Sequence, residues 1–362
     1  MQISDLDTPA VLIDRDVMER NLDRVAAYCR EHDLRLRPHT KTHKIPAVGA
    51  LQLARGAVGL TVAKVSEAEV MLASGTEDLL VAYPVIGKRK LDRLMKVAQQ
   101  VHVTISLDSL FAARQLSDAA RAAGITFGVL AEVDVGLRRV GVEPGEVVAL
   151  AQGIARLPRL HFEGIAFYPG HIKLMDEEGI AGLQELEATL KEVLRELRAA
   201  GFECRVVSGG STPTLFESHR VRSMNEIRPG TYIFNDRNTV LCGACRWEDC
   251  AACVLTTVVS TAVKGQVIID GGSKTFSSDR LVTGEAGFGR ILEAPEAIFT
   301  KMNEEHGFVD VRRAGVEFEV GDRVRVIPNH ICVVMNLHER VYGVRGETVE
   351  QIWTVDGRGK LQ

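Results

Sequence analysis

The feature that most constrains the fold of this chain is a regular alternation, over residues 14–235, of short apolar runs with amphipathic segments. The apolar runs predict eight strands, at residues 35–40, 57–62, 79–83, 101–106, 126–133, 160–168, 203–208 and 225–228. Eight strands with helices between them predict a (β/α)8 barrel of the TIM type. A doubly wound open sheet is the alternative that the alternation leaves open.

Two of the amphipathic segments carry clear helix signals. Over residues 177–200, apolar side chains recur every three or four positions, and Gly201 follows where a helix commonly ends in glycine. A first helix is predicted over residues 15–30, because Asp14 is a suitable N-terminal capping residue.

After about residue 235 the pattern changes to short, β-rich runs separated by glycines, at residues 251–263, 266–269, 324–327 and 331–335. We therefore predict two domains. The barrel takes residues 14–235 and a mostly-β domain takes residues 236–362, with residues 1–13 as a candidate extra strand of the second domain.

The composition excludes several classes of protein. The chain has 44 Lys and Arg against 48 Asp and Glu, a net charge of −4, so a basic surface for nucleic acid is not expected. No apolar run approaches the roughly 20 residues that a membrane span needs. The acidic N-terminus is unlike a signal peptide, and seven cysteines, an odd number, do not suggest a disulfide framework. We expect a cytoplasmic protein with reduced thiols and a small-molecule substrate, without nucleic-acid or membrane partners.

In a (β/α)8 barrel, the residues that follow each strand are the candidates for a functional site. Three strand ends carry reactive or charged side chains, namely Lys41 and Lys44 after the first strand, Arg138 and Arg139 after the fifth, and Tyr168 and His171 after the sixth. A lysine there can form a Schiff base with an aldehyde, arginines can bind an anionic oxygen, and a Tyr–His pair can transfer protons. Each also has a structural interpretation, as a solvated loop charge, a salt bridge or a packed side chain.

Two glycine turns after the last two predicted strands suggest a phosphate site. One contains Gly209, Gly210, Ser211, Thr212 and Pro213, and the other contains Gly230, Thr231 and Tyr232. Glycines let backbone N–H groups approach an anion, hydroxyls add donors, and a proline can start a helix whose N-terminus favours phosphate. The alternative is that both are tight turns only. A lysine facing a phosphate site fits a phosphorylated aldehyde cofactor, pyridoxal 5′-phosphate (PLP).

The predicted β domain offers a metal site at His330 and Cys332. Side chains two apart on a strand point to the same face, and an imidazole with a thiolate suits Zn²⁺ or a similar divalent ion. Two ligands leave positions open for substrate and water. The alternative is a cysteine beside an unrelated histidine.

A second group of cysteines has the pattern C-x2-C-x4-C-x2-C, formed by Cys242, Cys245, Cys250 and Cys253. Its middle spacer is much shorter than in the usual zinc ribbon, and its last two members lie in or beside an apolar run. We therefore predict no metal at this group.

Six motifs taken together resemble one family over nearly the whole chain. They are RPHTKTHK, DVGLRRVGV, SGGSTPT, EIRPGTY, IIDGGSKTFSSD and PNHIC. They resemble the D-threonine aldolase and D-serine dehydratase group of alanine racemase-like PLP enzymes, called fold-type III.

The resemblance implies a role for each matching residue. Lys41 would carry the cofactor as a Schiff base, Arg139 would contact its phenolic oxygen and Tyr168 would lie beside its ring. His330 and Cys332 would bind a catalytic divalent ion, for which Zn²⁺, Mn²⁺, Co²⁺ and Mg²⁺ are candidates and the thiolate favours the softer ones. The phosphate would be bound by Gly210, Ser211, Thr212, Gly230 and Thr231, with Tyr232 close by. Family members are typically homodimers in which the β domain of one subunit faces the barrel of the other.

The implied activity is a lyase reaction on a D-3-hydroxy amino acid, with two outcomes open. Removal of the 3-hydroxyl proton leads to glycine and an aldehyde, whereas removal of the Cα proton by Lys41 leads to a 2-oxo acid and ammonia. In this group aldolases tend to pair the metal histidine with aspartate and dehydratases with cysteine, so Cys332 favours a dehydratase. The segments around Lys41 and residues 208–214 are nearer to the aldolases, and the aldolase is our hypothesis. His171 is a candidate base for the hydroxyl proton. His43 is a candidate for a residue that supports the catalytic groups without contacting the substrate.

Two other kinds of protein with this fold are disfavoured. Racemases use a tyrosine two residues before an Asp-Gly pair as a second base, and here Ile268 precedes Asp270 and Gly271. Non-catalytic PLP-homeostasis proteins consist of the barrel alone, so the extra β domain argues against that function.

Overall fold

The computed structural model describes all 362 residues and divides the chain into two compact units. The barrel unit comprises Val25–Lys41, Pro46–Gly230 and Lys360–Gln362. The β-rich unit comprises Met1–Arg24, Thr42–Ile45 and Thr231–Gly359. The domain ranges 14–235 and 236–362 drawn from the sequence stay a prediction.

The barrel unit contains one sheet of eight parallel strands. They are β2 (Arg35–Leu36), β3 (Leu60–Val62), β4 (Asp78–Val81), β5 (His102–Leu107), β6 (Phe127–Val133), β7 (Leu160–Phe167), β8 (Val206–Gly209) and β9 (Glu226–Ile227). Their order is β2-β9-β8-β7-β6-β5-β4-β3, so β4 to β8 each pair with the strands before and after them in the chain, and β9 pairs with β8 and β2. The backbone N–H of Thr61 donates to the Pro38 carbonyl, and a bridge joins His39 to Thr61, so β2 also meets β3. The predicted (β/α)8 barrel is confirmed, and the open sheet is excluded.

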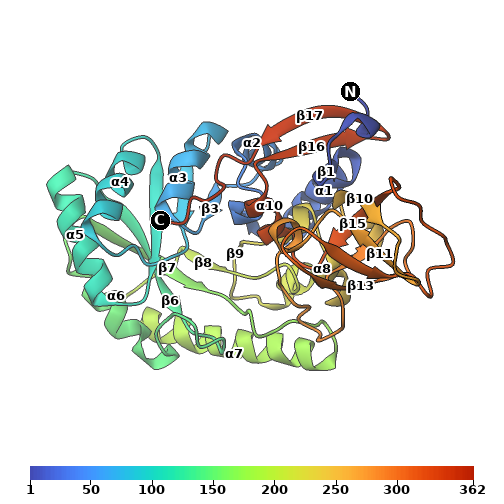
Figure 1. Cartoon of the computed structure of the whole chain (residues 1–362). Helices are drawn as coiled ribbons and strands as arrows, with labels where there is room; N and C mark the ends of the chain where they lie inside the picture. Colours follow the sequence, from blue (N-terminus) through green and yellow to red (C-terminus); the bar gives the residue numbers. More distant parts are fainter. The chain divides into compact units, whose positions relative to one another are not determined.

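Helices follow the strands and cover the outside of the sheet, as Figure 1 shows for α3 to α7. Those of the barrel unit are α2 (Pro46–Leu53), α3 (Val65–Met71), α4 (Lys88–Ala98), α5 (Leu110–Ala123), α6 (Val147–Ala155) and α7 (Glu177–Ala199). The helix α1 (Arg15–Glu31) begins in the β-rich unit and ends in the barrel unit. Both helices predicted from the sequence are confirmed: the N–H of Val17 donates to Asp14 Oδ1, and Gly201 has φ +85° just after α7.

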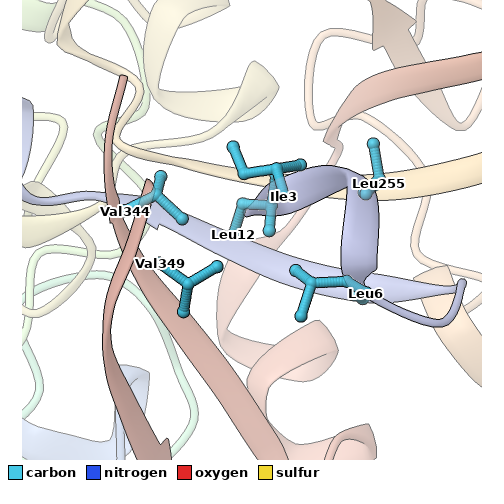
Figure 2. Packing of buried hydrophobic residues seen from close by; sticks show 7 residues of the cluster. Ile3, Leu6, Leu12, Leu255, Val344 and Val349 are labelled. Atoms are coloured by element: carbon cyan, nitrogen blue, oxygen red, sulfur yellow. The ribbon is translucent and has the colours of Figure 1, made fainter. Parts of the chain in front are cut away.

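The β-rich unit is built on a sheet of nine strands. They are β1 (Ala10–Asp14), β10 (Ala252–Ser260), β11 (Gln266–Ile269), β12 (Gly289–Ile291), β13 (Ile298–Met302), β14 (Gly307–Asp310), β15 (Arg323–Pro328), β16 (Arg340–Arg345) and β17 (Thr348–Thr354). The N-terminal strand β1 runs between β10 and β16, antiparallel to the first and parallel to the second. Figure 2 shows the apolar cluster on this strand, where Ile3, Leu6 and Leu12 pack with Leu255, Val344 and Val349.

The strand predicted at residues 331–335 is wrong. These residues begin the helix α10 (Ile331–Leu337), and His330 is its N-cap residue. A short apolar run fits a buried helix as well as a strand, and here Ile331, Val334 and Met335, spaced three and four apart, are the buried ones. The inference that His330 and Cys332 share a face through strand alternation therefore fails. Two further short helices, α8 (Arg237–Leu241) and α9 (Ser273–Phe276), belong to this unit. No helix in the structure combines the length and the apolar character needed to span a bilayer.

Candidate functional site

The loop after β8 presents backbone donors at the carboxyl end of the barrel sheet. Gly210 adopts φ +81°, a left-handed conformation that suits glycine, and Ser211 and Thr214 are tied together by their hydroxyls, 3.1 Å apart. The backbone N–H groups of Gly210 and Thr212, both buried, donate to no other group of the fold. Buried N–H groups without acceptors carry a free-energy cost that an anion would relieve. The loop is therefore a cradle that fits a phosphate.

The helix expected after Pro213 is only a six-residue 3-10 helix, Leu215–Arg220. It is too short to carry the dipole of a full α-helix. The donors of the cradle therefore come from the loop itself.

A second loop, after β6, is shaped by Asp134. Its Oδ1 accepts the backbone N–H groups of Gly136 and Arg138, each at 3.0 Å. Burial would raise the pKa of the Asp134 carboxyl, but these N–H donors lower it below its ordinary value. The loop then places the Arg139 guanidinium 4.9 Å from the centre of the Tyr168 ring. Arg139 and Tyr168, which were both predicted to contact PLP, thus contact each other.

His171 approaches the same loop from the segment after β7. A Cβ built on Gly136 would lie only 3.1 Å from the imidazole, so the glycine makes room for this ring. The His171 side chain is otherwise exposed, as a group that exchanges protons with a substrate or solvent must be.

Lys41 lies on the 3-10 turn Thr40–Thr42 that follows β2, and it is exposed. Because all eight strands are parallel, this turn and the loops after β6, β7 and β8 lie at one end of the sheet. Lys44 differs: it belongs to the β-rich unit, is buried, and donates from Nζ to Asn336 Oδ1 at 2.8 Å. It is therefore not the solvated loop charge that the sequence left as an alternative.

His330 and Cys332 lie together at the start of α10, with their side chains hydrogen-bonded to each other. Cys332 Sγ is also 3.2 Å from Thr42 Oγ1 and 3.5 Å from Thr231 Oγ1. Thr42 directly follows Lys41 in the sequence, and Thr231 directly follows Gly230. The Thr231 hydroxyl, which we expected to bind a phosphate, is therefore hydrogen-bonded to Cys332.

Electrostatics shift the pKa values of Cys332 and His330 in opposite directions. Burial would raise the pKa of the Cys332 thiol, but the charge of His330 and the hydrogen bonds from it and from both threonines lower that pKa. Burial would lower the pKa of His330, but the Cys332 thiolate and the carboxylates of Asp236 and Asp279 raise it to about 10. A thiolate is the form of cysteine that binds metal ions. No three His, Cys, Asp or Glu side chains are grouped so that they could hold a metal ion.

Sequence reasoning missed the residues that hold this pair in place. Buried Asp236 accepts the N–H of Ile331 at 3.0 Å and the N–H of Thr239 at 2.9 Å. Buried Asn329 accepts an amide N–H of Asn238 on its carbonyl, at 2.8 Å. Asp236 lies far from His330 in the sequence and follows no spacing rule, whereas Asn329 stands beside His330 in the motif PNHIC and could have been found there. Asp279, which contacts His330, closes the motif IIDGGSKTFSSD and could have been found there.

The four-cysteine group does not act as one unit. Cys245 hydrogen-bonds Cys250, which together with burial raises the pKa of the Cys250 thiol above its ordinary value. Cys253 lies apart on β10, where burial raises the pKa of its thiol to about 12.

Two family models match the chain. The model of the alanine racemase N-terminal domain matches residues 13–238, and a model of a serine dehydratase domain matches residues 251–344.

Curated relatives and solved structures match over almost the whole length. The chain is 34% identical to D-threonine aldolase from Arthrobacter sp, over 98% of this chain and 93% of the relative. It is 35% identical to D-threo-3-hydroxyaspartate dehydratase from Delftia sp. strain HT23, over 90% and 91% of the two chains. The crystal structure of D-threonine aldolase from Filomicrobium marinum matches with a TM-score of 0.92 and 32% identity, over 99% and 98%. A D-threo-3-hydroxyaspartate dehydratase structure, of a cysteine-to-alanine mutant in the metal-free form, matches with a TM-score of 0.90 and 31% identity, over 98% of each chain.

Proposed function

The chain belongs to the alanine racemase N-terminal domain family, and from this premise we propose that it is a PLP- and divalent-metal-dependent lyase. Its proposed reaction is cleavage of a D-3-hydroxy amino acid into glycine and an aldehyde. The family implies PLP, and the relatives are named as aldolases and dehydratases, which are lyases. The observation that carries the proposal is the N–H cradle after β8, at the same end of the sheet as Lys41.

The barrel unit has the groups to hold PLP. Lys41 would bind its aldehyde carbon through Nζ, and Arg139 and Tyr168 would flank its ring. The phosphate would be bound by Gly210, Ser211 and Thr212 with Gly230, Thr231 and Tyr232. Thr231 would donate its backbone N–H to the phosphate, because its hydroxyl is hydrogen-bonded to Cys332. When bound, PLP supplies an electron sink for the carbanion left at Cα.

The β-rich unit has the groups to hold a divalent ion. The imidazole of His330 and the thiolate of Cys332 form a donor set that suits Zn²⁺ and other soft divalent ions. Such an ion supplies Lewis acidity at the 3-hydroxyl of the substrate. We also propose a homodimer with a shared active site, which light scattering after gel filtration tests directly.

Proton movement separates the aldolase from its alternative. His171, an exposed imidazole beside Gly136, is proposed to take the proton of the 3-hydroxyl. For an aldolase, Lys41 must leave the Cα proton of the substrate in place.

A dehydratase is the second candidate, and Cys332 is the observation that favours it. The dehydratase relative was solved as a cysteine-to-alanine mutant in the metal-free form. A D-3-hydroxy amino acid would then lose its Cα proton to Lys41 and its hydroxyl to the ion, and would end as a 2-oxo acid and ammonia.

Product analysis decides between them. Purified protein loaded with PLP and Zn²⁺ or Mn²⁺ is incubated with D-threonine. Glycine and acetaldehyde support the aldolase, and 2-oxobutyrate and ammonia support the dehydratase. Neither product, with this and other D-3-hydroxy amino acids, overturns the lyase proposal.

The metal ligands are tested with His330→Ala and Cys332→Ala. Both variants should keep PLP absorbance but lose Zn²⁺ binding, and added metal should not restore their activity. Cys204→Ala, a cysteine of the barrel unit that precedes β8 instead of following it, is the matched control. Wild-type turnover in His330→Ala would remove the metal from the mechanism.

A further inference from the structure

We propose that Asp279 is a positioning residue that fixes the imidazole of His330, so that Nε2 is the atom offered to the divalent ion. This inference rests on the proposed function, because it concerns how the proposed ligand His330 is oriented. It assigns a role to a residue outside the proposed ligand set.

The contact is specific to one ring nitrogen. Nδ1 of His330 lies 2.9 Å from Oδ2 of Asp279. A carboxylate only accepts hydrogen bonds, so in this contact Nδ1 carries the proton and donates it. When the ring is neutral with its remaining proton on Nδ1, as metal binding requires, its lone pair is on Nε2. Metal-binding histidines usually pair their other ring nitrogen with such an acceptor.

Asp279 is itself fastened to the segment that carries the histidine. Its backbone carbonyl accepts an amide N–H of Asn329, the residue before His330, at 3.0 Å. The same amide donates to the Gly287 carbonyl at 2.9 Å, and Asn329 is only 2% exposed. The backbone N–H of Asp279 donates to Ser277 Oγ at 3.2 Å. The aspartate is thus joined to the ligand segment at two points, one through its backbone and one through its carboxylate.

A contribution to folding stability does not account for the contact. The side chains of His330 and Asp279 are 38% and 43% exposed, and ion pairs in contact with solvent add little to stability. Orientation is what the bond supplies: it removes rotational freedom about the last torsion of the imidazole. A metal ion then binds a ring that is already placed.

The test is the affinity of the purified, PLP-loaded protein for Zn²⁺ alone, measured by competition with a chromophoric chelator. Asp279→Ala should weaken Zn²⁺ binding about 10- to 100-fold. Asp279→Asn keeps an acceptor oxygen without the charge and should recover part of the loss. Ser278→Ala changes the exposed neighbour and is the matched control.

Two further readouts separate orientation from general damage. Thermal melting and PLP absorbance should be the same in Asp279→Asn and wild type. Long-range ¹⁵N correlation spectra of the histidine rings should show Nδ1 protonated and Nε2 bound to Zn²⁺ in wild type.

The outcomes distinguish this inference from the proposed function. Zn²⁺ affinity within twofold of wild type in both Asp279 variants, or Zn²⁺ on Nδ1, would overturn the role of Asp279 and leave the metal site standing. Unchanged Zn²⁺ affinity in His330→Ala would instead overturn the metal site.

Discussion

The two units of the molecule place their candidate groups by different means. In the barrel unit, Tyr168 and the cradle at Gly210 follow directly on parallel strands, and Lys41 lies on the 3-10 turn after β2, so the backbone positions them. In the β-rich unit, His330 and Cys332 are held by side-chain hydrogen bonds from residues far away in the sequence. Positions set by backbone geometry follow from a strand pattern, whereas positions set by side-chain networks do not.

The largest effect should come from Lys41→Ala, which tests placement by the backbone. Without the amine, PLP has no covalent attachment, so its protein-bound absorbance should disappear and activity should fall by about 10³-fold or more. The rest of the barrel should be unchanged, because Lys41 is exposed. Absorbance spectra and product formation measure both effects.

Lys88→Ala is the control for this substitution, because Lys88 lies on α4 and is solvent-exposed. Activity that survives in Lys41→Ala would show that the lysine at this strand end is not the attachment site. The comparison between the units would then lose its main example.

Most of the structure of the barrel unit could be predicted from the sequence alone. All eight strands were predicted, most of them because buried parallel strands are continuous apolar runs, and the family resemblance is confirmed by the match over residues 13–238. The weak point was residues 331–335, where five apolar residues fit either a strand or a helix. The first N–H of this helix is capped by the Asp236 carboxylate, which accepts the N–H of Ile331 from 95 residues away. No local pattern carries that information.

The barrel interior also contains a side-chain network, and Arg37→Leu should break it. Arg37 Nε donates to Glu226 at 3.0 Å and Nη1 donates to Asp78 at 2.7 Å, and the Glu226 side chain is fully buried. Removal of the arginine leaves a buried carboxylate without its partner, which should cost about 3–5 kcal/mol of unfolding free energy. Chemical denaturation measures this loss.

The double variant Arg37→Leu/Glu226→Leu should recover much of that stability, because the fully buried Glu226 carboxylate that Arg37→Leu leaves behind is removed as well. Recovery in the double variant would show that the side-chain network of the barrel unit stabilises the fold and does not position a candidate group. A stability loss in Arg37→Leu below about 1 kcal/mol would show that the pair is solvated in solution.

In the β-rich unit, Asp236→Asn should affect the site as well as the fold. An amide NH2 in place of one oxygen would face the N–H of Ile331 or of Thr239, leaving a buried donor unsatisfied at a cost of about 1–3 kcal/mol. Zn²⁺ affinity should fall because the first turn of α10 carries both proposed ligands. PLP absorbance should stay, since the cradle belongs to the other unit.

Asp92→Asn, an exposed aspartate on α4, is the control for Asp236→Asn. If Zn²⁺ affinity is unchanged while stability falls, the segment before α10 is positioned without this capping bond. Among the side chains named above, only Asn329 and Asp279 would then position His330 and Cys332.

The smallest effect concerns the amino-terminal end of the barrel strands, where His102 and Asp78 pair. The hydrogen bond to Asp78 raises the pKa of His102 above its ordinary value. The raised folded-state pKa means that the pair stabilises the fold fully below the unfolded-state pKa of about 6.5 and loses this contribution as pH rises through the folded-state value. His102→Gln should therefore lower the unfolding free energy more at pH 5.5 than at pH 8.5. The difference should be less than about 1 kcal/mol, because the His102 side chain is 49% exposed.

Denaturation curves at both pH values measure the difference. Equal losses at the two pH values would contradict the assignment, and a matching change in activity would show that the two ends of the barrel are coupled.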